Sequence, residues 1–177
     1  MAASDGFTVI VARTQRLTLR WLTTDDADFV LALVNDPDWL RYIGDRGIHS
    51  VNDAVAYIEA GPKAMYQRLG YGLFAVTRNR GGQSIGMCGL IQRDTLPGVD
   101  IGYALLPQYR RQGYALEAAQ ACVTLARDQF GIRRLLAITS PDNAPSAHLL
   151  GKLGLRFEHL LELVPGSDPV ALYAGNI

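Results

Sequence analysis

The residues whose types and spacing best predict chemistry lie between 108 and 115, in the string Gln-Tyr-Arg-Arg-Gln-Gly-Tyr-Ala. This polar, basic loop runs directly into a long stretch of helix-forming residues. The first backbone N–H groups of a helix have no intrahelical acceptor, and the helix dipole places partial positive charge beside them. Gly113 and Ala115 leave room for a ligand at the backbone, and Arg110 and Arg111 add positive charge. The pattern therefore predicts a pyrophosphate-binding site at this helix start.

A second polar block lies farther along the chain. It reads Asn143-x-x-Ser146, followed by Gly-Lys-Leu-Gly-Leu over residues 151–155. An asparagine turn and a helix-capping serine would explain this block by itself. Its order and spacing relative to the basic loop allow a second interpretation, in which both blocks belong to one ligand-binding site.

Together the two blocks resemble the GNAT acetyltransferases. That family carries Gln/Arg-x-x-Gly-x-Gly/Ala between a strand and a long helix, and Arg110, Gly113 and Ala115 match this pattern. The string over residues 109–118 is similar to the RimJ/RimL branch, which often has glycine where Arg111 stands. The second block is similar to the family's Asn-x-x-Ser segment, and the whole resemblance covers about residues 16–163.

The resemblance implies that acetyl-CoA is the co-substrate and that no metal takes part. Main-chain groups near Leu105 and Leu106 would meet the acetyl and pantetheine groups, Asn143 would bind the pantetheine, and Ser146 would sit near the thioester sulfur. The full set of implied cofactor-binding residues is Leu105, Leu106, Arg110, Arg111, Gln112, Gly113, Tyr114, Ala115, Asn143 and Ser146.

Acetyl transfer to an amine needs a base, and the resemblance implies Asp100 as the candidate. It stands early in a strand where many relatives carry Glu, although an outward-facing strand carboxylate is an equally good interpretation. An α-amine has an ordinary pKa of about 7.7–8.0, so a modest base suffices. The family's frequent general-acid Tyr would fall on Leu150, and Ser146 is the nearest substitute.

The acceptor amine is weakly encoded. Trp39, Tyr42 and Tyr57 lie in the N-terminal helical region that flanks the acceptor cleft in such folds, and they form the predicted substrate-binding set. The alternative for Trp39 and Tyr57 is a role as core aromatics. A peptide N-terminus, an antibiotic amine and a small metabolite all remain candidate acceptors, and the amine of each would attack the acetyl group directly in a ternary complex.

Hydrophobic periodicity and turn residues place these groups on a β-α-α-β-β-β-α-β-α-β order. The meander followed by strand–helix–strand predicts one α/β (α+β) domain over residues 1–177, with residues 1–12 flexible. The resemblance implies a mixed, largely antiparallel sheet of about six to seven strands flanked by about four helices. The expected strands are 17–22, 73–77, 84–92, 99–106, 135–140 and 157–164; the expected helices follow residues 23, 50, 113 and 143, and residues 165–177 are ambiguous.

Composition limits the partners. The 17 Lys and Arg residues balance 17 Asp and Glu residues, which does not favour nucleic acid or a membrane surface as a partner. The N-terminus shows no secretory signal, so a cytoplasmic location is expected. Cys88 and Cys122 are expected to be buried and reduced, and the three histidines show no zinc-ligand spacing.

Two other functions remain open from the sequence. A non-catalytic acyl-CoA-binding or sensing module could share the fold, because the usual acid is missing at Leu150. Residues 70–75, Gly-Tyr-Gly-Leu-Phe-Ala, fit the dinucleotide fingerprint, but a helical region precedes them and strand-like residues follow. The family resemblance also makes a homodimer plausible.

Overall fold

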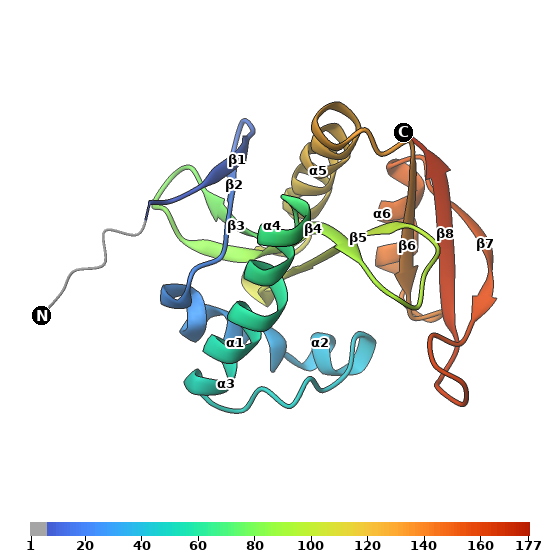
Figure 1. The fold of residues 1–177 in the computed structure, drawn as a ribbon, viewed down its shortest axis with the longest axis horizontal. Helices are drawn as coiled ribbons and strands as arrows, with labels where there is room; N and C mark the ends of the chain where they lie inside the picture. The colour runs from blue at the N-terminus through green and yellow to red at the C-terminus, as the bar shows by residue number, and fades with distance from the viewer. Residues whose placement is uncertain (1–6) are drawn as a thin grey trace, which may run out of the picture.

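A single mixed sheet of eight strands organises the computed structural model, which describes residues 7–177 (Figure 1). The strand order is β1-β2-β3-β4-β5-β6-β8-β7, and all neighbours are antiparallel except β5 and β6. The predicted mixed, largely antiparallel sheet is confirmed, with more strands than the six to seven expected. The strands are β1 Ile10–Arg13, β2 Leu17–Arg20, β3 Leu73–Arg78, β4 Ser84–Gln92, β5 Val99–Leu105, β6 Arg134–Thr139, β7 Arg156–Leu161 and β8 Val170–Asn176.

The helices form two groups that cover opposite faces of the sheet (Figure 1). On one face the long helix α5 packs on alternate strand residues such as Phe74 and Ile101. On the other face α1 and α3 pack on Ala75 and Met87. The helices are α1 Ala27–Val34, α2 Pro37–Tyr42, α3 Val51–Ile58, α4 Ala64–Leu69, α5 Tyr114–Phe130 and α6 Ala144–Lys152.

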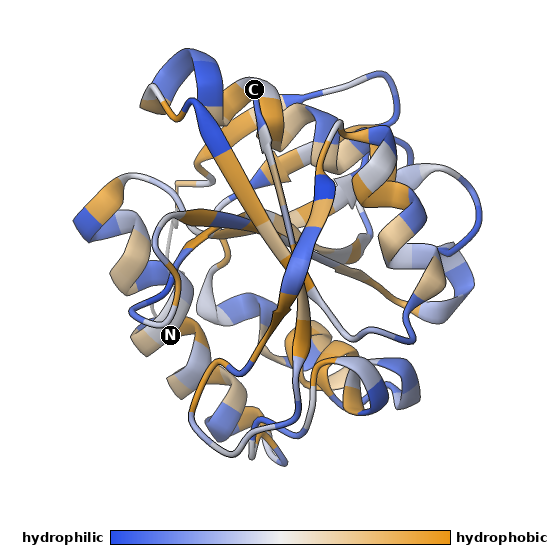
Figure 2. Ribbon diagram, turned by 90° about the vertical axis from the view of Figure 1, so that its right-hand side faces the viewer, coloured by the Kyte–Doolittle hydropathy of each residue, from blue (hydrophilic) through white to orange (hydrophobic). Residues whose placement is uncertain are grey.

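Alternation along the strands explains why the sheet has two cores. Successive side chains of a strand point to opposite faces, so each inner strand contributes apolar residues to both layers. Figure 2 shows orange (apolar) segments along several strands, whereas the helices carry both orange and blue (hydrophilic) segments. Cys88 of β4 and Cys122 of α5 are both buried as free thiols, as expected, with their sulfurs 3.6 Å apart.

The parallel neighbours β5 and β6 separate along their length. Only one residue pair, Asp100 with Leu136, joins them, near the start of both strands. Beyond that pair the strands diverge toward Leu105 and Thr139. A gap therefore opens in the middle of the sheet, between the meander and the β6-β8-β7 end.

Two prolines lie within the helical region of the chain without ending it. The first predicted helix does end at Val34, but Pro37 then begins α2, where a first-turn proline loses no intrahelical hydrogen bond. Pro62 does not end the third helix either. It lies in a five-residue π-helical turn, Glu59–Lys63, whose wider hydrogen-bond spacing carries the chain into α4.

The chain ends add strands that the pattern did not predict. Residues 10–12, expected to be flexible, belong to β1, which pairs with β2; residues 1–6 lie outside the described part of the chain. The ambiguous segment 165–177 contains β8, which inserts between β6 and β7. This insertion brings together strands far apart in sequence, which local periodicity cannot reveal. No helix within residues 7–177 is long and apolar enough to span a membrane.

Candidate active site

A cavity of about 930 Å³ opens where β5 and β6 diverge, and it reaches from the α1–α4 side of the sheet to α5 and α6. It brings together residues that are distant in sequence. The predicted site residues in its wall are Trp39, Tyr42, Tyr57, Asp100, Leu105, Arg110, Arg111, Gly113, Tyr114, Ala115, Asn143 and Ser146. Leu106 and Gln112 lie outside that wall.

Strand β5 offers free backbone donors to the cavity. The Leu106 N–H donates to the Ile85 carbonyl at 2.8 Å, so this amide is occupied within the sheet. In an antiparallel pair successive residues direct their N–H groups to opposite sides. The N–H groups of Leu105 and Tyr103 therefore point toward β6, into the gap, and Leu105 is the better candidate of the predicted pair.

The start of α5 presents a second group of backbone donors. The first intrahelical bond of the turn runs from the Glu117 N–H to the Gly113 carbonyl, so the N–H groups of Tyr114, Ala115 and Leu116 precede it. Gly113 adopts a left-handed φ of 82° as the N-cap. Such an end favours anions through its free N–H groups and the helix dipole.

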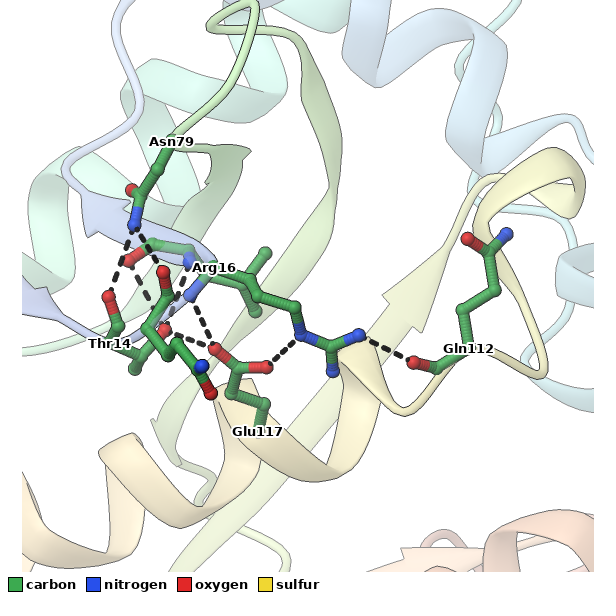
Figure 3. Close-up of polar contacts among 7 residues, drawn as sticks. Thr14, Arg16, Asn79, Gln112 and Glu117 are labelled. Carbon is green, nitrogen blue, oxygen red and sulfur yellow. Dashed lines mark hydrogen bonds and ion pairs between the residues drawn. The ribbon is translucent and has the colours of Figure 1, made fainter.

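An ion-paired network fixes this helix start against the β1–β2 turn (Figure 3). Glu117 accepts from the Thr14 hydroxyl at 2.6 Å and pairs with the Arg16 guanidinium at 2.6 Å. Arg16 also donates to the Gln112 carbonyl at 2.8 Å. Because the C=O and N–H of a planar trans peptide point in opposite directions, this bond turns the Gly113 N–H away from Arg16.

Arg110 takes a different position from the one expected. Its guanidinium pairs with Asp36 and with Asp38, the latter at 2.6 Å, and its Nε donates to the Leu105 carbonyl at 3.1 Å. Its positive charge is thus neutralised by the N-terminal end of α2. Arg111 keeps its charge at the loop and adopts a left-handed φ of 59°, where the RimJ/RimL version often has glycine.

Asp100 lies at the closed end of the gap and is only 1% exposed, which excludes the outward-facing alternative. Its Oδ1 accepts from Arg93 Nε at 3.0 Å. Its Oδ2 accepts no hydrogen bond from any residue between 7 and 177. Burial raises the pKa of this carboxyl, and the Arg93 ion pair opposes part of that rise. Alternation along β5 places the side chain on the α1–α3 face.

Tyr103 was missed by sequence reasoning. Its hydroxyl lies 2.8 Å from the Ser146 hydroxyl, on the α5–α6 face of the gap. Burial raises the pKa of Tyr103 to about 12, although the Ser146 hydrogen bond lowers it. Asn143 caps α6 by accepting from the Ser146 N–H at 3.2 Å, and the buried Leu150 occupies the place expected for the family's acid. The sequence signal that could have identified Tyr103 is a phenol two residues before Leu105.

The acceptor-side aromatics have two roles at once. Trp39 is 7% exposed and packs in the core beneath α1 and α3, yet it also lines the cavity. Its indole Nε1–H has no hydrogen-bond acceptor among the described residues. Tyr42 and Tyr57 line the same part of the wall.

The dinucleotide interpretation of residues 70–75 is wrong. Gly70 ends α4 with a left-handed φ of 79°, and β3 begins at Leu73. A nucleotide fingerprint needs a strand before and a helix after its glycines, and here the order is reversed. Within residues 7–177, no group of three or more His, Cys, Asp or Glu side chains is arranged to hold a metal ion.

Comparison with known proteins decides the family. The family model for the acetyltransferase (GNAT) domain matches residues 16–156. The chain belongs to the GNAT acetyltransferase family. This acetyltransferase is 29% identical over 154 residues to the uncharacterized N-acetyltransferase YoaA of Bacillus subtilis (strain 168), and the match covers 85% of each chain.

Solved structures agree with this membership. The acetyltransferase from Agrobacterium tumefaciens str. C58 superposes with a TM-score of 0.77 at 25% identity, covering 99% of this chain and 97% of its own. RimL, the ribosomal L7/L12 alpha-N-protein acetyltransferase, in complex with coenzyme A, gives a TM-score of 0.80 at 20% identity, with 95% and 98% covered. The RimL likeness shows that the two chains share the same fold.

Proposed function

We propose that this acetyltransferase moves the acetyl group of acetyl-CoA to a primary amine by direct attack in a ternary complex. One observation carries the proposal. A single cavity joins the start of α5, with its free N–H groups, to Asp100, whose Oδ2 accepts no hydrogen bond within residues 7–177. The coenzyme A bound to RimL supports the choice of donor.

The two substrates would approach from opposite faces of the sheet. The pyrophosphate of acetyl-CoA would bind at Gly113, Tyr114 and Ala115, beside Arg111, which forms no ion pair with any residue between 7 and 177. The pantetheine would then enter the gap between β5 and β6 beside Asn143. The amine would come from the α1–α3 side, where Asp100 lies.

The proton and charge movements then follow from the side chains in the wall. Asp100 Oδ2 would accept a proton from the amine, and the amine nitrogen would form a bond to the acetyl carbon. The Leu105 N–H would stabilise the negative charge on the carbonyl oxygen. The carbon–sulfur bond would break, and the Tyr103 and Ser146 hydroxyls would donate hydrogen bonds to the departing thiolate.

The base is tested by replacing Asp100 with Asn. A general base contributes roughly 10²–10⁴-fold, so kcat should fall at least about 100-fold while acetyl-CoA still binds. In the unchanged enzyme, kcat/KM should rise with pH through a pKa above the ordinary aspartate value, because only the ionised carboxylate accepts the proton. Release of free thiol from acetyl-CoA measures both.

A matched variant at another aspartate serves as the control for this test. Asp94→Asn removes an exposed carboxylate of the same type from the loop after β4 and should leave the rate unchanged. A normal rate and an unaltered pH profile in Asp100→Asn would contradict the assignment of the base.

A non-catalytic acyl-CoA-binding module is the second candidate function. The observation that favours it is Leu150, which occupies the place of the family's usual acid. Acetyl-CoA binding without thiol release, against a panel of peptide N-termini, polyamines and amino acids, would select this alternative.

Cytoplasmic location and homodimer formation stay predictions. The edge strand β7 exposes Phe157 and Leu160, both more than half accessible, which is compatible with a second copy of the chain. Light scattering of the purified protein measures the oligomeric state.

A further inference from the structure

We propose that the acceptor is a small amino-acid-like molecule, a primary amine that also carries an anionic group on an apolar body. This inference rests on the proposed function and names the acceptor class for the same cavity. It follows from the hydrogen-bonding groups and charges that the cavity wall leaves without partners.

The wall holds one buried donor without an acceptor. Trp39 is 7% exposed, it lines the cavity, and its indole Nε1–H reaches no acceptor within residues 7–177. An unpaired buried donor is destabilising, so most buried donors in proteins have a partner. Nε1 itself has almost no accessible surface, so a ligand atom with a lone pair would satisfy it once the indole turns toward the cavity, whereas an ammonium could not satisfy it.

The wall also holds one buried acceptor without a donor. Asp100 Oδ2 has no partner in the described part of the chain, while Oδ1 is bound by Arg93. A primary amine supplies the missing donor. The acceptor molecule therefore needs a donor at one point and a hydrogen-bond acceptor at another.

The charges of the arginines in the cavity wall indicate the chemical nature of the second group, the hydrogen-bond acceptor of the ligand. Of the arginines on the acceptor side of the cavity, Arg93 is paired with Asp100 and Arg110 with Asp36. No described carboxylate lies within ion-pair distance of Arg46, and the adjacent Asp45 contacts His49 instead.

Arg46 lines the same cavity, and its side chain is exposed. A carboxylate or phosphonate would pair with Arg46 by charge-assisted hydrogen bonds. A simple diamine would instead add a second positive charge beside it.

The remaining wall fits an apolar body. Leu73 and Met87 line the cavity and pack in the same hydrophobic cluster as Trp39, and Ile43 and Met65 line the cavity as well. Burial of an aliphatic side chain against them would be favourable. A hydrophobic amino acid such as leucine combines all three features: an amine, an anion and an aliphatic side chain.

The test compares three acceptors that differ only in the second group. They are leucine, leucinamide and the aminophosphonate analogue of leucine, each assayed for kcat/KM with saturating acetyl-CoA. Leucinamide has the less basic amine, so deprotonation alone would favour the amide. We expect the anionic acceptors to exceed leucinamide by at least about tenfold, the effect of one charge-assisted pair. Whichever anion is preferred identifies the anionic group.

Substitution of Arg46 tests whether this residue causes the preference for leucine over leucinamide. Arg46→Gln should reduce the ratio of leucine to leucinamide to near one, chiefly through the KM for leucine. Arg127→Gln, which removes an exposed arginine near the far end of α5, should keep the ratio of the unchanged enzyme.

Equal or better acetylation of leucinamide, or of a peptide that begins with leucine, would overturn the anionic acceptor and leave the amine acetyltransferase standing. A leucine preference that survives Arg46→Gln would overturn it as well. Calorimetric titration of leucine into the protein in the presence of coenzyme A tests acceptor binding separately from acetyl transfer. Leucine binding that Arg46→Gln abolishes, without any turnover, would support the acceptor class and reject the proposed transfer.

Discussion

The Tyr103 and Ser146 hydroxyls form a pair on the cofactor side of the gap, where the leaving sulfur would lie. A phenol with a pKa of about 12 is a poor donor of its proton to a thiolate, since ordinary thiols have a pKa near 8.5. Its contribution would be a hydrogen bond that stabilises the thiolate. The same raised pKa keeps Tyr103 protonated at every working pH.

Replacing Tyr103 with Phe tests this role. Because a hydrogen bond to a charged group contributes about 1.5–3 kcal/mol, we expect kcat to fall roughly 10- to 100-fold with little change in the KM for the amine. Between pH 6 and pH 10 the ratio of the two rates should stay constant, since pH does not change the protonation of Tyr103 there. Steady-state rates across that range measure it.

Two outcomes would contradict the role. An unchanged kcat in Tyr103→Phe would remove the phenol from catalysis. A ratio that falls steeply on the alkaline side would indicate that Tyr103 titrates and acts as a true acid.

At the scale of elements, Arg110 joins the cofactor loop to the acceptor wall. Its guanidinium binds the Leu105 carbonyl at the end of β5 and the carboxylates of Asp36 and Asp38. Asp36 also caps α2 by accepting from the Trp39 N–H. The position of Trp39 in the acceptor cavity is thereby tied to the loop that would hold acetyl-CoA.

Glu117 anchors the start of α5 in a comparable way. Burial raises the pKa of this carboxyl, but the hydrogen bonds from Thr14 and Arg16 outweigh burial and leave the pKa below its ordinary value. A depressed folded pKa means that the stabilisation is present above the unfolded pKa. It is lost as the pH falls through the folded pKa.

We therefore expect Glu117→Gln to lower the free energy of unfolding by about 1–2 kcal/mol at neutral pH. The difference should shrink as the pH falls below about 4, where the unchanged carboxyl is protonated as well. Denaturant unfolding at several pH values measures it. Glu158→Gln, which removes the carboxylate of the more exposed pair with Arg134, serves as the control, with an effect below about 1 kcal/mol. Equal losses in both variants, or a loss independent of pH, would refute the anchoring role.

The sequence predicted the elements that depend on local signals. The meander, α5 and α6 carry periodic apolar residues with recognisable turn or capping residues, and the loop over residues 108–113 is recognisable by its polar and basic residues. The parts it did not predict depend on distant contacts: β1 needs β2 as a partner, and β8 is placed between β6 and β7. The sequence also does not show in which direction each side chain points. For this reason Arg110 was expected at the cofactor site and Tyr103 was overlooked.

For the whole molecule, the divergence of β5 from β6 is the feature that produces function. It opens the sheet between two helix layers, so that groups from opposite faces meet in one cavity. Free backbone N–H groups and Arg111 lie at one end, and Asp100 with the unpaired Trp39 indole lies toward the other. The family membership and the cavity therefore point to the same chemistry.

Calorimetric titration of acetyl-CoA into the purified protein tests this account most directly, with NADH as the ligand control and Gly113→Glu as the variant. We predict binding of acetyl-CoA in about the micromolar range and none of NADH. Gly113→Glu should abolish acetyl-CoA binding, because it places bulk and negative charge at the start of α5; circular dichroism would verify that the variant is folded. Absence of acetyl-CoA binding to the unchanged protein, or equal binding to the folded variant, would contradict the placement of the pyrophosphate at this helix start.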